Sequence, residues 1–171
     1  RIVKRGKLAA IIGIEGAHAL GDDPGALRAM YDRGVRCLTV TWSNTNAFAD
    51  AADDTARWNG LSESGRALVR EMNRLGMAID LSHASDATLF AVLAETKRPV
   101  IVSHSCMRAL CDIPRNIGDE AVRAVAERGG VVCVNFYAGF LEKAVSDSMS
   151  AILGRYRARA AELAPQFGGN Y

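Results

Sequence analysis

Two short apolar runs in the middle of the chain each end in the dipeptide Ser-His. Residues 78–81 lead to His83 and residues 100–102 lead to His104, with a helix-like segment at residues 86–95 between them. Strand, helix and strand in this order indicate two parallel strands, and the carboxyl ends of parallel strands lie on one face of a sheet. The sequence therefore predicts that the two imidazoles converge there, as imidazoles do in a metal site.

Apolar runs and helical patterns alternate along most of the chain. The predicted strands are residues 8–14, 35–41, 78–81, 100–102 and 131–136, and the predicted helices are residues 24–33, 63–75, 86–95, 119–128 and 143–165. This alternation implies a parallel sheet with right-handed crossovers, either an open doubly wound sheet or part of a (β/α)8 barrel. No G-x-G-x-x-G motif follows the first strand, which disfavours a dinucleotide-binding domain. Because a complete barrel has about 250 residues, a barrel reading makes these 171 residues a part of one.

Composition narrows the class of partner. The net charge is only +2 and no basic run interleaves with aromatic residues, so nothing points to nucleic acid and a small molecule is the expected partner. Four cysteines are too few for a disulfide scaffold, which favours a reducing, cytoplasmic compartment. No apolar run approaches the roughly 20 residues that span a bilayer, and the first residues turn polar too soon for a signal peptide.

A third strand-like run also ends in a possible metal ligand. Glu15 follows residues 8–14, so one carboxylate and two imidazoles stand at strand ends. This set suits Zn²⁺ or a similar divalent ion, and a carboxylate can bridge two metals. A single strand-end histidine is more often structural than a ligand, but the repeated Ser-His pattern favours the metal site. Asp80 has two open roles, a hydrogen bond to a ligand imidazole or to backbone groups.

Two further features lie near the predicted strand ends. The polar stretch at residues 43–60 is long for a connection in an α/β domain, and we expect it to cover functional groups. Arg115 follows Pro114 shortly after the His104 strand. A guanidinium there can hold a substrate carboxylate through two hydrogen bonds, although arginines on the surface are commoner.

Six ordered segments together resemble the membrane dipeptidase family, also called renal dipeptidase or peptidase M19, and a bacterial member in particular. The segments are IGIEGAH at residues 12–18, GVRCLTVTW at 34–42, IDLSH at 79–83, VSHS at 102–105, ALCDIPRN at 109–116 and VVCVNFYAGFL at 131–141. The resemblance implies a (β/α)8 barrel of the metal-dependent hydrolase type. It also implies two zinc ions at the carboxyl ends of the strands, and hydrolysis of dipeptides, often with a C-terminal D-residue.

The resemblance assigns roles to single residues. Glu15 corresponds to the carboxylate that bridges the two metals, and His83 and His104 to ligands of one zinc ion. Arg115 corresponds to the residue that binds the substrate carboxylate or the tetrahedral intermediate. The chemistry implied is attack of a metal-bridged hydroxide on the peptide carbonyl, so Glu15 and Arg115 are the expected catalytic residues.

Three departures from the family pattern are visible. The His-x-Asp pair near the family's N-terminus and a late-strand aspartate have no counterpart in this sequence. Residues 1–171 are therefore expected to be one partial barrel domain, an internal fragment without the first and last parts of the barrel. Trp42 stands where mammalian members place a histidine thought to bind substrate, so a substrate contact of different chemistry is expected there.

The prediction from sequence is a zinc-dependent dipeptidase that needs two zinc ions in its complete active site. A first alternative is a related metal-dependent amidohydrolase that acts on N-acyl amino acids or lactones. A second alternative is an inactive scaffold or binding protein. The expected partner is a dipeptide, with no nucleic acid and no membrane, and a homodimer is a further possibility.

Overall fold

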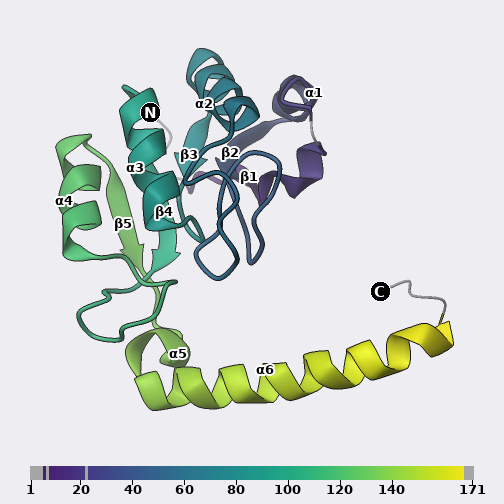
Figure 1. The fold of residues 1–171 in the computed structure, drawn as a ribbon. Coiled ribbons are helices and arrows are strands. Elements are labelled where there is room, and N and C mark those ends of the chain that lie inside the picture. Colours follow the sequence, from purple (N-terminus) through teal and green to yellow (C-terminus); the bar gives the residue numbers. More distant parts are fainter. Residues whose placement is uncertain (1–5, 7, 22, 168–171) are drawn as a thin grey trace.

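The computed structural model describes residues 6, 8–21 and 23–167. The rest of the predicted domain, residues 1–5, 7, 22 and 168–171, lies outside this description. At the centre is a five-stranded, wholly parallel sheet in the order β1-β2-β3-β4-β5 (Figure 1). The strands are β1 Ile12–Glu15, β2 Val35–Thr39, β3 Ala78–Asp80, β4 Ile101–Ser105 and β5 Val131–Val134.

The helices that connect the strands form one layer. They are α1 Ala26–Asp32, α2 Glu63–Leu75, α3 Asp86–Glu95 and α4 Asp119–Glu127, and each packs beside the next. In a doubly wound sheet the strand order reverses at a switch point and helices cover both faces. Here the strand order follows the chain without reversal and the helices lie on one side, which is the arrangement of a (β/α)8 barrel. The fold is therefore the predicted barrel type, with five of its strands.

The hydrophobic core lies between the sheet and this helix layer. Its fully buried members come from both sides, with Leu38 from β2 and Leu27, Leu68, Met72, Val92 and Val125 from the helices. The opposite, inner face of the sheet borders an apolar hollow of about 470 Å³ that Cys37 and Ile101 help to line. The carboxyl ends of the strands lie at one rim of this hollow, where Glu15 and His104 are found.

Helix ends follow local signals in the sequence. Ser62 caps α2, with its hydroxyl accepting a hydrogen bond from the backbone N–H of Gly65 at 3.0 Å. Gly76 ends α2 in the left-handed conformation, at φ 73°. Ser85 caps α3 in the same way as Ser62, through the N–H of Thr88. These boundaries agree with the predicted helices.

The structure corrects several predicted boundaries; β2 ends at Thr39 and β5 at Val134, each two residues early, and β1, α1 and β4 also differ. β1 begins at Ile12 rather than Leu8 and is mostly exposed, although its apolar run predicts burial on both faces. Among the described residues β1 pairs only with β2, so one of its edges and its inner face are uncovered. α1 begins at Ala26 because the Asp23 carboxylate accepts the Gly25 N–H at 2.7 Å and forms a turn first. β4 continues through His104 instead of ending before it.

Two helices follow the sheet and extend away from it. α5, Ala138–Leu141, was not predicted, and it leads into the long α6, Lys143–Leu163. α6 has no buried residue, and it runs below the carboxyl ends of the strands in Figure 1. Its large apolar side chains Ile152, Leu153 and Tyr156 are therefore exposed.

Candidate metal centre

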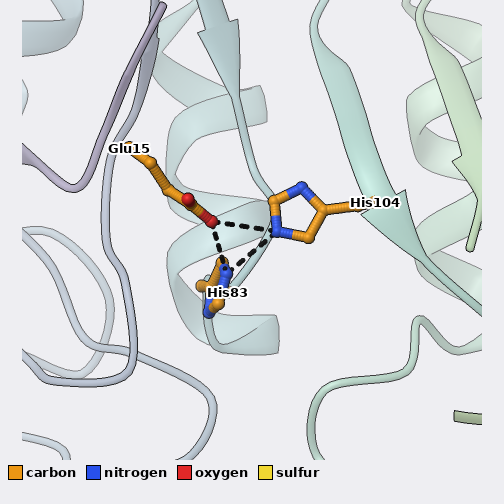
Figure 2. Close-up of side chains that lie close together, drawn as sticks. All are labelled: Glu15, His83 and His104. Carbon is orange, nitrogen blue, oxygen red and sulfur yellow. Dashed lines mark hydrogen bonds and ion pairs between the residues drawn. The ribbon is translucent and has the colours of Figure 1, made fainter. Parts of the chain in front are cut away.

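Glu15, His83 and His104 converge at the carboxyl ends of β1, β3 and β4 (Figure 2). The Nε2 atom of His83 lies 2.9 Å from Oε1 of Glu15 and 2.9 Å from Nε2 of His104. The remaining pair, Nε2 of His104 and Oε1 of Glu15, is 3.1 Å apart. The structure thus brings together the three predicted ligands, which are distant in the chain.

This donor set fits a zinc ion. Two ligands at about 2.1 Å from one tetrahedral zinc lie roughly 3.4 Å apart, close to the observed separations. The side chain of His83 is 12% exposed, that of His104 30% and that of Glu15 50%. The carboxylate is therefore the open side of the cluster, and its second oxygen is free to reach a second metal.

A strained backbone presents the His83 ring. His83 has φ 67°, a left-handed conformation that is unusual for a residue with a side chain. Its carbonyl accepts a hydrogen bond from the N–H of Ala52 at 2.8 Å, and Ala51 forms a β-bridge with Ala84. The long loop at residues 43–60 therefore holds the segment that carries this ligand, which agrees with the expectation that the loop covers functional groups.

Asp50 organises that loop, and sequence reasoning missed it. Its fully buried carboxylate accepts hydrogen bonds from the backbone N–H groups of Arg57, Trp58 and Gly60 at 2.7 to 3.2 Å. Its own carbonyl accepts the N–H of Ser85 at 3.1 Å. The only sequence signal for this arrangement is an aspartate in a long loop that ends in Gly. The signal is weak, because many loops share that composition.

The environment of His83 keeps its imidazole neutral. Burial away from water, then the positive charge of Arg115, and the repulsion that a protonated His104 would add, lower the pKa of His83 to about 4, against the opposing effect of Glu15. Metal binding needs the neutral ring, so the site keeps His83 in the form that can bind. Its Nδ1 is buried and has no hydrogen-bond partner among the residues that the structure describes, whereas Figure 2 shows Nε2 directed at the cluster.

We expect the metal-free protein to lose stability as the pH falls from about 6.5, the pKa of histidine in an unfolded chain, to about 4. In that window the unfolded chain binds a proton at His83 that the folded chain does not, so stability declines with falling pH and levels off below it. Ring NMR titration of His83 and urea unfolding across this window measure both effects. A His83 that titrates near its ordinary value contradicts the prediction.

Arg115 lies beside the cluster with little to neutralise its charge. Its side chain is 9% exposed, and burial lowers the pKa of its guanidinium. The nearest carboxylate is that of Asp53, 3.9 Å away, and the carbonyl of His104 accepts a long bond of 3.4 Å. The guanidinium also stacks over the ring of Phe140 at 5.1 Å. A buried cation with such weak partners is suited to bind an anionic ligand.

Trp42 follows β2 and is 50% exposed. A Cβ added to Gly16, the residue after Glu15, would lie 3.2 Å from Cβ of Trp42, so the two segments are in close contact. The structure thus places Trp42 next to the metal-ligand segment. Cys106 and Cys111 are buried free thiols, as is common for cysteines in a core.

Comparison with known proteins connects this geometry to a family. The family model described as membrane dipeptidase (peptidase family M19) matches residues 1–160. The chain belongs to the membrane dipeptidase family. An uncharacterized dipeptidase of Schizosaccharomyces pombe is 46% identical over 138 residues, which cover 80% of this chain and 34% of that protein. The chain spans about a third of the length of the curated relatives that it matches.

Solved structures of M19 relatives share the fold. The probable dipeptidase PvdM from Pseudomonas aeruginosa superposes with a TM-score of 0.77 at 32% identity, over 92% of this chain and 42% of that one. A metallo peptidase from Rhodobacter sphaeroides, solved with a phosphinate mimic of the dipeptide L-Ala-D-Ala, superposes with a TM-score of 0.74 at 32% identity, over 81% of this chain and 41% of that one. Within the described residues, no helix combines the length and apolar character that a membrane crossing requires.

Proposed function

We propose that this member of the membrane dipeptidase family carries part of a two-zinc site that hydrolyses dipeptides. The observation that carries the proposal is the convergence of Glu15, His83 and His104 within 3.1 Å of one another at the carboxyl rim of the sheet. In this proposal Glu15 would be the ligand shared by both zinc ions, and the two histidines would hold one of them. The rim is where barrel enzymes of this kind have their active sites.

Zinc, when bound, supplies the Lewis acidity that polarises a peptide carbonyl and makes water a nucleophile near neutral pH. The residues of the chain then have separate tasks. Glu15 offers a carboxylate on the open side of the cluster, and His83 and His104 offer two ring nitrogens from fixed directions. Arg115 holds the negative charge of the substrate or of the tetrahedral intermediate from its buried position.

A cavity that Arg115 helps to line is large enough for a dipeptide, although Glu15, His83 and His104 are not part of its lining. It has a volume of about 560 Å³, and its lining includes Asp53, Tyr137, Phe140 and Arg157. Small-molecule sites commonly measure about 300 to 1,000 Å³. The phosphinate dipeptide mimic bound by the Rhodobacter relative supports the same substrate class. We propose that Arg115 reads the free carboxylate of the dipeptide and that Trp42 contacts the substrate from the Glu15 side.

Arg115→Lys is expected to raise KM for a dipeptide by about 10- to 100-fold, with a smaller effect on kcat. Lysine keeps the charge but loses the planar pair of N–H donors that matches a carboxylate, so binding weakens most. Steady-state kinetics of the wild type and of Arg115→Lys, on a dipeptide and on its C-terminal amide, measure the effect. The amide has no carboxylate, so the two proteins should hydrolyse it alike, and an equal loss on both substrates argues against this role.

Metal analysis tests the proposal as a whole. Elemental analysis of the full-length protein after dialysis at neutral pH should find about two zinc ions per chain, as in two-metal hydrolases. One or none would favour the inactive scaffold. Comparing dipeptides with N-acyl amino acids and lactones then separates the dipeptidase from the related amidohydrolase, since we expect a dipeptidase to need the free amino group.

The four free thiols support our further proposal of a cytoplasmic location.

A further inference from the structure

Asp80 is a buried carboxylate with a full set of hydrogen-bond donors. It ends β3, is 3% exposed, and joins three strands. Its Oδ1 accepts the backbone N–H groups of Ser82 and Ser103 at 3.0 Å each. Its Oδ2 accepts the hydroxyls of Thr39 at 2.8 Å and of Ser103 at 2.5 Å. Burial alone raises the pKa of Asp80, but these hydrogen bonds outweigh burial and hold the pKa below its usual value.

The proton of Ser103 is therefore committed to Asp80. A serine hydroxyl has one proton, and an ionised carboxylate can only accept. At the short contact with Asp80 the proton must come from Ser103, so the Ser103 oxygen acts as an acceptor toward its other neighbours. Those neighbours are Nδ1 of His104 at 2.8 Å and the hydroxyl of Ser82 at 3.2 Å.

This assignment of donors and acceptors determines the tautomer of His104. If Ser103 accepts, Nδ1 of His104 must carry the proton, and the neutral ring then has its lone pair on Nε2. Nε2 is the atom that faces Glu15 and His83, while Nδ1 lies on the far side of the ring (Figure 2). The backbone N–H of His104 also donates to Ser82 at 2.9 Å, which holds the residue from a second direction.

The two histidines are held by different means. Within the described part of the chain, Nδ1 of His83 has no partner, and the residue is oriented through its backbone, by the contact of its carbonyl with Ala52. His104 is oriented through its ring nitrogen, by Ser103. A change at Ser103 or Asp80 should therefore act on one of the two imidazoles.

We propose that Asp80 is a positioning residue for His104. Acting through Ser103, it keeps Nδ1 of His104 protonated and Nε2 unprotonated and directed at the metal cluster. The functional role of this chain of hydrogen bonds rests on the proposed zinc site. The tautomer of His104, in contrast, is a property of the metal-free protein. Groups that orient metal-binding histidines in this way typically change metal affinity by about 10- to 100-fold when they are removed.

The first test measures the tautomer in the metal-free, full-length protein. ¹⁵N NMR of the His104 ring should show Nδ1 protonated in the wild type, in Ser103→Thr, which keeps the hydroxyl, and in Thr39→Val, which removes a donor to Asp80 that has no hydrogen bond to His104 among the described residues. In Asp80→Asn the amide can donate to Ser103, which turns the Ser103 proton toward Nδ1 and shifts the proton of His104 to Nε2. A wild-type ring protonated at Nε2 overturns the proposal.

The second test measures zinc affinity by competition with a chelating dye. Asp80→Asn and Ser103→Ala should bind zinc about 10- to 100-fold more weakly than the wild type, with Ser103→Thr and Thr39→Val close to it. If Asp80→Asn does not fold, Ser103→Ala still decides, because it leaves Asp80 three donors. If Asp80→Asn and Ser103→Ala both keep the wild-type tautomer and zinc affinity, the positioning role is wrong. That result does not contradict the proposed zinc site. If the tautomers are as expected but the wild type binds no zinc, the proposed function is wrong. The effect of Asp80 on the His104 tautomer is not contradicted by that result.

Discussion

Replacing Glu15 with Gln is expected to remove most of the bound zinc and to lower kcat on dipeptides by about 1,000-fold or more, since metal ions contribute several kcal/mol to such reactions. Glutamine has nearly the same shape but no negative charge, so it cannot bridge two cations as a carboxylate does. His83 and His104 remain in place, and a single weakly held zinc ion is the expected remainder. Elemental analysis and steady-state kinetics of the purified variant measure both losses.

Glu127→Gln provides the matched control. Glu127 is an exposed carboxylate in the last turn of α4, at the opposite end of the β/α units from the cluster. The same loss of charge there should leave zinc content and kcat as in the wild type. If Glu15→Gln and the control are alike in metal content and rate, Glu15 has no bridging role, and the scaffold alternative gains support.

Replacing Gly65 with Ala is expected to destabilise the protein by about 3 kcal/mol or more, at the upper end of what overpacking costs. Gly65 lies in the first turn of α2, where a Cβ would overlap the backbone carbonyl of Phe48 and press on Leu61. The Phe48 side chain is fully buried, and its carbonyl accepts the N–H of Ser62 at 2.9 Å. Neither helix nor loop can therefore move without breaking packing or the cap.

Gly154→Ala is the control for this substitution. Gly154 lies in the exposed helix α6, and apart from its chain neighbours and the adjacent helix backbone no described atom lies within 4 Å of the Cβ that alanine would add. There the same change should increase stability by about 0.5 to 1 kcal/mol, because alanine favours the helix. Urea unfolding of the two variants measures the contrast. Equal stabilities would show that α2 and the Phe48 loop do not pack as closely as the structure has them.

Loss of stability in Gly65→Ala also bears on the site. The loop that contains Phe48 continues to Ala52, whose N–H holds the backbone of His83. A displaced Phe48 should therefore disturb His83, one of the proposed zinc ligands, as well as the core. This loop is one path by which packing at α2 reaches the metal cluster, and the contacts of α2 with β3 and α3 are another.

The sequence allowed some features to be predicted because their causes are local. The ends of α2 follow from Ser62 and Gly76, each of which acts within one turn of the helix. The positions of Glu15, His83 and His104 after apolar runs indicated which side chains would stand at strand ends. The burial of β1 was predicted wrongly, because an apolar run does not report whether both faces of its strand are covered.

Taken by itself, the sequence determined the order of strands and helices, the family, and the residue types at the rim of the sheet. Tertiary structure alone decided that Glu15, His83 and His104 meet within 3.1 Å, that Arg115 is buried beside them, and that Asp80 reaches His104 through Ser103. The physical reason is the distance along the chain between the groups that interact. Caps and turns depend on groups a few residues apart, whereas these contacts depend on the register between parallel strands, which the packing of the whole sheet and its helix layer sets.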